Sequence, residues 1–257
     1  MLRANAKKLT KGKQGIKKIL NYRGGGFSQL ENSINTINHN ILALHRQLNF
    51  IQTLLLKNSS LNAIFDSIYE TNLWGNGSGS GSKETLNQGY VAFLQNFMRE
   101  SLISSVVDVG CGDWQFSKNI DFSNIYYTGY DVASFVINAN NAKYAKDNIT
   151  FEHYDGDFSQ IKSADLLLCK DVLQHLPTSK IHEFISILPK FKYALITNDN
   201  ANKQIANFEN KQIAPGQYRP LDLRKAPFNL NLEPVFMITR MPAQPDICVM
   251  LYKNEKF

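Results

Sequence analysis

Two apolar patterns divide the chain. Between residues 30 and 55, apolar side chains recur with alternating steps of four and three, at Leu30, Ile34, Ile37, Ile41, Leu44, Leu48, Ile51 and Leu55. A period of 3.5 residues sustained in this way is typical of a coiled-coil seam. The alternative is a long amphipathic helix that lies on its own domain. We expect a homo-oligomerisation helix over residues 28–57, in which the mixed Ile and Leu seam leaves the number of strands open.

From residue 58 onward, strand-like and helix-like patterns alternate. Short apolar runs predict buried strands at residues 106–109, 125–130, 149–154, 166–169 and 193–197. Apolar positions three and four apart predict helices at residues 61–72, 85–98, 134–146 and 178–188. Two last runs, 234–240 and 247–252, predict an antiparallel hairpin. This order of elements predicts a doubly wound α/β sheet with the hairpin at one edge.

Polar residues at the predicted helix starts indicate where two helices begin. Ser59 and Ser60 precede the helix that starts at Leu61 and can cap it. Asp113 is expected to cap a further helix that contains Phe116 and Ser117.

The first strand of the α/β region ends in a glycine turn. Val109 is followed by Gly110, Cys111 and Gly112. Glycine adopts positive φ without penalty and lets the backbone approach a ligand closely. Because open α/β sheets bind ligands at the carboxyl ends of their strands, this turn is a candidate ligand cradle. An ordinary strand turn is the alternative.

Polar residues also follow the later strands. Asp131 lies nineteen residues after Gly112, where a carboxylate binds ribose hydroxyls in nucleotide-binding sheets, although a turn cap is the alternative. Asp157 can accept a hydrogen bond from an adenine amine, although its Asp-Gly-Asp context also favours a plain turn. Lys170 and Asp171 follow the fourth strand. These side chains are expected at one edge of the sheet.

The turn lacks the phosphate-binding signatures. A dinucleotide motif G-x-G-x-x-G needs a third glycine, and Gln115 occupies that place. The G-x-x-x-x-G-K-[ST] motif is absent as well. A nucleoside ligand without a pyrophosphate fits better. The amides of Gly110 and Gly112, with the Asp108 carboxylate, could hold an amino-acid moiety.

Composition restricts the partners. The 257 residues carry a net charge of +6, but eight basic residues precede the first acid, Glu31, which leaves 20 basic against 22 acidic residues and a net charge of −2. A nucleic-acid enzyme should carry a basic face on its domain. The basic tail, residues 1–27, could contact an anionic membrane surface or another polyanion, but a solvated, partly disordered tail is favoured.

The apolar runs, the N-terminus and the cysteines indicate the cellular location. No apolar run is long enough for a transmembrane helix, and the basic N-terminus lacks the apolar core of a secretory signal. Cys111, Cys169 and Cys248 show neither zinc spacing nor a disulfide framework, so no metal site is predicted and a reducing cytoplasm is expected.

Two segments are candidate parts of the site, residues 73–83 as a lid and residues 200–230 as an acceptor loop. Residues 73–83 contain Trp74 and alternating Gly and Ser, which composition alone favours as a flexible linker over a lid. Residues 200–230 form a long proline-containing loop of the kind that is usually functional or disordered.

The motifs V-V-D-V-G-C-G-D-W, Y-D-V and L-L-L-C-K-D-V-L-Q-H-L resemble class I S-adenosylmethionine-dependent methyltransferases. Trp74 with its Gly/Ser run, D-W-Q-F-S, D-V-L-Q-H-L-P and R-P-L-D-L with a later P-F resemble a bacterial subgroup that modifies small molecules and surface polysaccharides, capsule included. The resemblance covers roughly residues 68–252. It implies a Rossmann-like seven-stranded sheet of order 3-2-1-4-5-7-6 within residues 58–257.

The resemblance also implies residue roles. The methionine portion of the cofactor would lie at Gly110 and Gly112, with Asp108 near its ammonium group. The ribose would lie at Asp131, next to Val132, and the adenine at Asp157 and Phe158. Lys170 would lie beside the cofactor. The resemblance favours a lid over a linker for residues 73–83, whose members Trp74 and Ser80 would cover the cofactor.

The acceptor chemistry remains open between two classes. A sugar hydroxyl would need a general base, for which His175 is the candidate. Asp171, one helical turn earlier, could orient its imidazole; a structural histidine is the alternative. A phosphate or phosphoramidate acceptor would instead need cations, for which Lys170, Arg219 and Arg224 are available. Arg219 is preferred, and the alternative is that it braces the loop. Tyr69 and Tyr218 are further candidate acceptor contacts.

Two other function classes share these features. An NAD(P)-binding oxidoreductase would use the same fold and Asp131, but the third glycine is missing. A non-catalytic oligomeric scaffold would use only the helix. A nucleic-acid methyltransferase is disfavoured by the net charge of −2 and by the lack of an N-P-P-[YF]-like motif after the fourth strand.

Overall fold

The computed structural model describes residues 29–30, 32–48, 51, 60–200, 209–239 and 245–257. The chain divides into two compact units, Met1–Asn49 and Phe50–Phe257. In the first unit, residues 32–48 are helical, as the heptad pattern predicts. The basic tail and part of the predicted 28–57 helix lie outside the described residues. The described part of the chain contains no helix that is long and apolar enough to cross a membrane.

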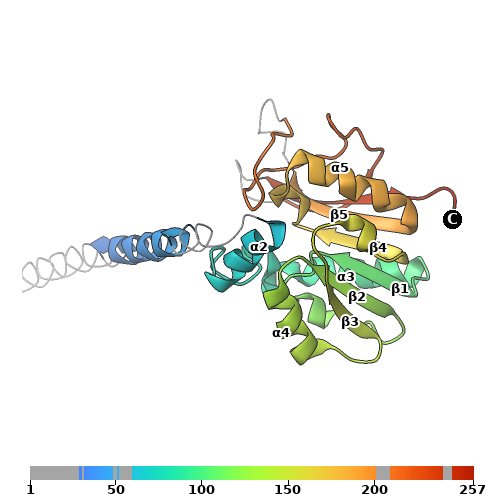
Figure 1. Cartoon of the computed structure of the whole chain (residues 1–257), viewed down its shortest axis with the longest axis horizontal. Helices are drawn as coiled ribbons and strands as arrows, with labels where there is room; N and C mark the ends of the chain where they lie inside the picture. The colour runs from blue at the N-terminus through green and yellow to red at the C-terminus, as the bar shows by residue number, and fades with distance from the viewer. Residues whose placement is uncertain (1–28, 31, 49–50, 52–59, 201–208, 240–244) are drawn as a thin grey trace, which may run out of the picture. The chain divides into compact units, whose positions relative to one another are not determined.

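The second unit is built on one seven-stranded sheet (Figure 1). Its strands are β1 (Ser105–Val109), β2 (Tyr126–Asp131), β3 (Ile149–His153), β4 (Ala164–Lys170), β5 (Phe191–Asn200), β6 (Glu233–Ile238) and β7 (Asp246–Lys253). Their order is β3-β2-β1-β4-β5-β7-β6. The first five strands are parallel, and β7 pairs antiparallel with both β5 and β6. The predicted order and edge hairpin are confirmed.

Within the described residues of this unit, four α-helices accompany the sheet: α2 (Leu61–Glu70), α3 (Glu84–Glu100), α4 (Ser134–Tyr144) and α5 (Thr178–Ile187). Successive side chains of β1 point to opposite faces of the sheet and therefore pack against different helices. Val107 and Val109 belong to a core cluster that includes residues of α2 and α5, whereas Val106 belongs to one that includes residues of α3. Apolar residues therefore cover both faces of the sheet, as a doubly wound fold requires.

Two helix starts test the capping predictions. The Ser60 hydroxyl accepts a hydrogen bond from the Ala63 amide at 3.3 Å and caps α2, as predicted. The prediction for Asp113 is wrong, because only a 3₁₀ turn, Ser117–Asn119, forms there and no side chain caps it. The Asp113 carboxylate instead accepts hydrogen bonds from the Ser78 amide and the Gln115 side chain.

The fifth strand is longer than its apolar run. The sequence places its end at Thr197, but β5 continues to Asn200 because its last residues pair with the start of β7. Asn198, Asp199 and Asn200 are therefore buried polar residues of the sheet.

Candidate functional site

A cavity opens where β1, β2 and β4 end, at the edge that the polar strand ends predict. Ten of the predicted site residues line it: Tyr69, Trp74, Asp108, Gly110, Gly112, Asp131, Val132, Lys170, Asp171 and His175. We call it the first cavity. Residues that sequence reasoning did not select also line it, among them Phe65, Ser78 and Tyr154.

The glycine turn shapes the floor of the first cavity. Gly110 and Gly112 have φ values of 76° and 56°, which favour glycine. A Cβ atom at Gly110 would lie 2.2 Å from Val172 Cγ2, and one at Gly112 would lie 2.3 Å from the Ser78 hydroxyl. Both positions therefore require glycine for conformation and for space.

Asp131 fixes the turn to the end of β2. Its carboxylate accepts hydrogen bonds from the Gly112 amide at 3.0 Å and from the Ala133 amide at 2.9 Å. The carboxylate therefore caps the turn and also lines the first cavity. Burial raises the pKa of Asp131 to about 6, although these amide bonds lower it.

Asp108 lies buried beneath the same cavity. Burial raises the pKa of this carboxyl to about 7, while the hydrogen bond from the Tyr127 hydroxyl, at 2.7 Å, lowers it. The Tyr127 hydroxyl in turn accepts a hydrogen bond from Trp114 Nε1 at 2.9 Å. A cationic ligand group near Asp108 would favour the ionised carboxylate and would offset its desolvation.

The Gly/Ser segment packs against the glycine turn. The Asp113 amide donates to the Ser78 hydroxyl at 2.8 Å, and the Asn76 side chain donates to Gln115 at 3.0 Å. The Ser78 hydroxyl lies 3.0 Å from the Tyr69 hydroxyl. Trp74, Ser78 and Ser82 of this segment line the first cavity. The segment is thus part of the cavity wall, and its role as a lid stays a prediction.

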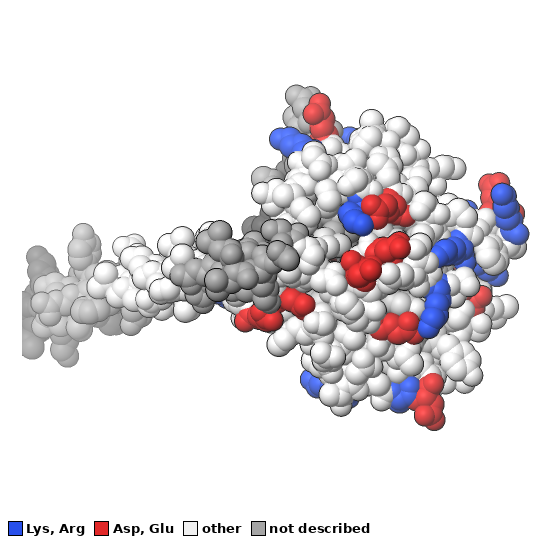
Figure 2. All heavy atoms as spheres, viewed as in Figure 1, with Lys and Arg blue, Asp and Glu red and all other residues white. Residues whose placement is uncertain are grey.

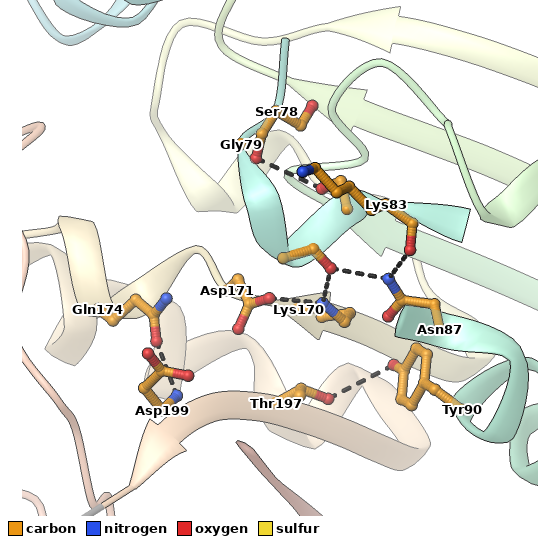
Figure 3. Close-up of polar contacts among 12 residues, drawn as sticks. Ser78, Gly79, Lys83, Asn87, Tyr90, Lys170, Asp171, Gln174, Thr197 and Asp199 are labelled. Carbon is orange, nitrogen blue, oxygen red and sulfur yellow. Dashed lines mark hydrogen bonds and ion pairs between the residues drawn. The ribbon is translucent and has the colours of Figure 1, made fainter. Parts of the chain in front are cut away.

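Lys170 joins this wall to the end of β4 (Figure 3). Its ammonium group donates to Asp171 Oδ2 at 2.5 Å and to the Gly81 carbonyl at 3.1 Å. Asn87 of α3 donates to the same carbonyl at 2.8 Å. The Lys170 side chain is 8% exposed and also lies 5.3 Å from the centre of the Phe116 ring.

A second cavity adjoins the first. Trp74, Ser78, Asp171 and His175 line both cavities and form their common wall. The second cavity is otherwise lined by Gly79, Ser80, Gly81, Gln174, Asp199 and Tyr218. A group bound in one cavity would therefore face a group bound in the other across four shared side chains.

The predicted helical turn between Asp171 and His175 is wrong. Asp171 has a φ of 59°, and the 3₁₀ turn Leu173–His175 follows it. Asp171 pairs with Lys170, and His175 Nδ1 lies 3.0 Å from the Gln217 carbonyl. Since a carbonyl only accepts, Nδ1 carries the proton in this contact and Nε2 of the neutral ring keeps a lone pair.

The surroundings of His175 favour its neutral form. Burial lowers the pKa of His175, and the nearby Gln217 carbonyl and the Asp171 carboxylate oppose that shift. The Trp74 ring lies 5.1 Å from the imidazole, centre to centre. At neutral pH the ring is therefore able to accept a proton.

Three predicted residues line neither cavity. The Asp157 carboxylate binds the Ser159 amide and hydroxyl, and Phe158 is buried in the core. The Arg219 guanidinium is buried and donates from Nη1 to the Leu176 carbonyl at 2.9 Å. Their predicted contacts with a cofactor or an acceptor stay predictions.

Sequence reasoning missed Gln174 and Asp199 in the second cavity. Asp199 follows the fifth apolar run, so the rule that polar residues at strand ends form the site would have selected it. Gln174 gives no such signal.

The chain matches no protein-family model and no curated protein. Its structure is similar to solved structures. One is the magnesium protoporphyrin IX methyltransferase ChlM of Synechocystis PCC 6803 with bound SAH (TM-score 0.51, 16% identity, 73% of this chain and 97% of that chain). Another is the N-methyltransferase NodS of Bradyrhizobium japonicum WM9 in complex with S-adenosyl-L-homocysteine (TM-score 0.51, 15% identity, 67% and 89%).

These likenesses cover 73% and 67% of this chain at low sequence identity. Together with the strand order and the antiparallel β7, they establish the architecture. The chain has the fold of the class I S-adenosylmethionine-dependent methyltransferases.

Proposed function

We propose that the protein is a methyltransferase that uses S-adenosylmethionine and methylates an oxygen atom of a small-molecule or saccharide acceptor. The observation that carries this proposal is the pair of cavities with a common wall. The first cavity has the glycine turn and two buried carboxylates, and His175 lies in the wall that this cavity shares with the second. One cavity suits a donor, and the other suits an acceptor.

The residues of the first cavity fit the cofactor. Asp108 would bind its ammonium group, and the backbone at Gly110 and Gly112 leaves room for the methionine portion. Asp131 and Val132 would bind the ribose, and Lys170 would lie beside the cofactor. Asp157 and Phe158 remain the proposed adenine contacts. Trp74 and Ser80 belong to the proposed lid.

Bound S-adenosylmethionine supplies a methyl group that is already electrophilic. The chain's own contribution is alignment of the acceptor, exclusion of water and removal of a proton. Alignment alone contributes about 7–11 kcal/mol in favourable cases. His175 would take the proton of an acceptor hydroxyl at Nε2, because the Gln217 carbonyl holds the proton of Nδ1.

The acceptor is proposed from the sequence motifs and the second cavity. We propose a sugar hydroxyl or a phosphate or phosphoramidate group, in the biosynthesis of surface polysaccharide such as capsule. Tyr69 and Tyr218 line the first and the second cavity, respectively, and support an acceptor near the common wall. An anionic acceptor would use Arg219.

We also propose that the chain self-associates through residues 30–55. The seam side chains that the structure describes, Leu30, Ile34, Ile37, Ile41, Leu44, Leu48 and Ile51, are all exposed by 45% or more. Burying such a row against a second copy would remove apolar surface from water. Sedimentation equilibrium of the full chain should give an oligomer, and an Ile37→Asp, Ile41→Asp double variant should sediment as a monomer.

The distribution of charged side chains over the surface bears on the choice of partners. On the face in Figure 2, basic and acidic side chains of the described residues lie interspersed. This pattern supports the proposal that nucleic acid is not the acceptor. We propose a cytoplasmic protein, with the basic tail as a weak membrane contact.

Calorimetric titration tests the cofactor. The full chain should bind S-adenosylmethionine and S-adenosylhomocysteine and should give no heat with NAD. An Asp131→Ala variant should lose most of the heat, and Asp147→Asn, which changes an exposed carboxylate before β3, should not. Heat with NAD alone would favour the oxidoreductase, and no heat with any of these ligands would favour the scaffold.

A further inference from the structure

The Gly81 carbonyl group is a point at which the Gly/Ser segment, residues 73–83, is held by the rest of the fold. It accepts a hydrogen bond from Lys170 Nζ at 3.1 Å and another from Asn87 Nδ2 at 2.8 Å (Figure 3). Lys170 ends β4, and Asn87 belongs to α3 and is 2% exposed. One donor from the sheet and one from a helix therefore fix the segment at Gly81.

The Lys170 ammonium group is enclosed by the protein itself. Besides the Gly81 carbonyl it binds Asp171 Oδ2 at 2.5 Å. It also lies 5.3 Å from the centre of the Phe116 ring and 5.8 Å from the centre of the Tyr90 ring. A hydrogen bond from a charged donor is stronger than one between neutral groups. The contact with Gly81 is therefore a strong attachment of the segment to the end of β4.

A second attachment, nearer the start of the segment, lies on the glycine turn. The Ser78 amide donates to the Asp113 carboxylate at 3.2 Å, and the Ser78 hydroxyl accepts from the Asp113 amide at 2.8 Å. Asn76 and Gln115 exchange two further hydrogen bonds, at 3.0 and 2.8 Å. The segment thus connects the turn after β1 with the end of β4, and both border the first cavity.

The first cavity is small for a nucleoside ligand. Its volume is about 80 Å³, whereas the volume of the second cavity is about 310 Å³. Pockets for ligands of this size usually measure about 300–1,000 Å³. Part of the wall must therefore move when such a ligand enters. The strand ends are fixed by the pairing of the sheet, whereas the Gly/Ser segment is joined to them by side-chain contacts.

Resting on the proposed methyltransferase function, we propose that the Gly/Ser segment is the part of the wall that moves and that Lys170 is its latch, a positioning residue that acts through the Gly81 carbonyl. While the latch is formed, Trp74 and Ser78 complete the common wall of the two cavities. When it breaks, the first cavity admits or releases the cofactor and the second cavity loses part of its lining. The acceptor cavity is therefore complete only while the cofactor cavity is closed.

The latch can be broken from either side. A Cβ atom at Gly81 would lie 2.9 Å from Asp171 Oδ2 and 3.9 Å from Lys170 Nζ. The first distance is shorter than an ordinary contact, so Gly81→Ala displaces the segment from this pair without removing a charge. Lys170→Met removes the charged donor from the strand side. The two substitutions change different elements and share only the loss of this contact.

Hydrogen exchange in the free full chain tests the latch without any ligand. The Ser82 and Lys83 amides donate to carbonyl groups of the same segment at 3.2 and 3.4 Å, so their exchange reports its opening. Gly81→Ala and Lys170→Met should each speed this exchange by at least about tenfold, as expected for the loss of a hydrogen bond from a charged donor. Unchanged exchange in both variants would overturn the proposal. If Lys170→Met does not fold, Gly81→Ala decides.

Two further lysine variants are the controls. Lys170→Arg keeps a charged donor beside Asp171 and should restore most of the protection of the segment. Lys162→Met removes a lysine that is 67% exposed and paired with Glu152 at 2.6 Å, and it lines neither cavity. Exchange in Lys162→Met should equal that of the unchanged chain. Equal acceleration in Lys162→Met and Lys170→Met would show a general loss of stability and would overturn the latch.

The rates of S-adenosylhomocysteine binding separate a latch from a direct cofactor contact. They are measured by stopped-flow tryptophan fluorescence, since Trp74 lies in the wall that moves. Lys170→Met should raise the association and the dissociation rate constants by about tenfold each, while Kd changes less. A rise of the dissociation rate constant alone would mean that Lys170 only contacts the cofactor, which overturns the latch. If S-adenosylhomocysteine does not bind, the proposed methyltransferase function fails, and exchange in the free chain still decides on the latch.

Discussion

The two cavities are built by different means. The first depends on backbone conformation: glycines with positive φ, amides that bind Asp131, and strand ends in fixed register. The second depends on side chains from β5, the 3₁₀ turn Leu173–His175 and the loop that carries Gln217 and Tyr218. Backbone requirements restrict residue choice and are visible in a sequence, whereas a side-chain cavity can be built in many ways.

Burial shifts the pKa values of the acids and of the histidine in opposite directions. In the first cavity, burial raises the pKa of Asp108 and Asp131 to about 7 and about 6. In the common wall of the two cavities, burial lowers the pKa of His175. In each case burial favours the neutral form. A cation that enters the first cavity would ionise the acids, whereas His175 accepts a proton only while it is neutral.

Replacing His175 should have the largest effect. His175→Ala should lower kcat by about 10²–10⁴-fold, the usual contribution of a general base, while the affinity for S-adenosylmethionine changes little. Turnover is followed by S-adenosylhomocysteine release, with the methyl glycosides of glucose, galactose, mannose and N-acetylglucosamine as candidate acceptors. Because the His175 pKa is lowered, kcat of the unchanged protein should not fall when the pH is lowered from 8 to 7.

His182→Ala is the matched control, since His182 is an exposed residue of α5 that lines neither cavity. It should leave kcat unchanged. Nearly full turnover by His175→Ala would contradict the general-base role and would favour an acceptor oxygen that is already ionised.

A methyl group on the glycine turn should have the next largest effect. Gly112→Ala places a side chain at φ 56° and 2.3 Å from the Ser78 hydroxyl, so the turn or the lid must move. The affinity for S-adenosylmethionine should fall by more than about tenfold, because strained backbone of this kind costs about 1–2 kcal/mol. Calorimetric titration measures the loss.

Gly89→Ala is the control for this substitution. Gly89 lies within α3, and an added Cβ would meet only Phe236 Cζ at 3.6 Å, an ordinary contact. Alanine should stabilise the helix by about 0.5–1 kcal/mol and leave cofactor affinity unchanged. Equal affinities of the two variants for S-adenosylmethionine would mean that the glycine turn is not the cofactor site.

The difference between the cavities also explains which features could be predicted from the sequence and which could not. The strand runs, the edge hairpin and the glycine turn depend on alternation and on glycine, and all were predicted. The Asp171–His175 turn was predicted wrongly because a spacing of four residues implies a helix only where the backbone is helical, and Asp171 has positive φ. The sequence contains no signal for the left-handed conformation of Asp171 or for the contact between His175 and the Gln217 carbonyl.

Pairing beyond the apolar run makes β5 longer than the sequence pattern predicts. Asp199 follows residues that end the apolar pattern, so the strand seemed to stop before it. In the sheet, its pairing with Ile247 of β7 continues β5 through Asp199. Long-range pairing of this kind is decided by a segment about fifty residues later, which local patterns do not report.

The smallest effect is expected from pH, and it separates the two cavities most directly. Asp108 has a pKa of about 7 in the free chain, so a ligand ammonium group must displace its proton at pH 6 but not at pH 8. The affinity for S-adenosylmethionine should therefore rise about tenfold between these pH values, with proton release on binding. The free energy of unfolding of the free chain should change in the opposite direction. Because burial raises the pKa of Asp108 above its value in the unfolded chain, the contribution of this carboxyl to stability is complete below about pH 4 and is lost as the pH rises through about 7. Asp108→Asn should remove both dependences, whereas His175→Ala should leave the pH dependence of affinity intact. An affinity that is constant from pH 6 to pH 8 would place the ammonium group away from Asp108.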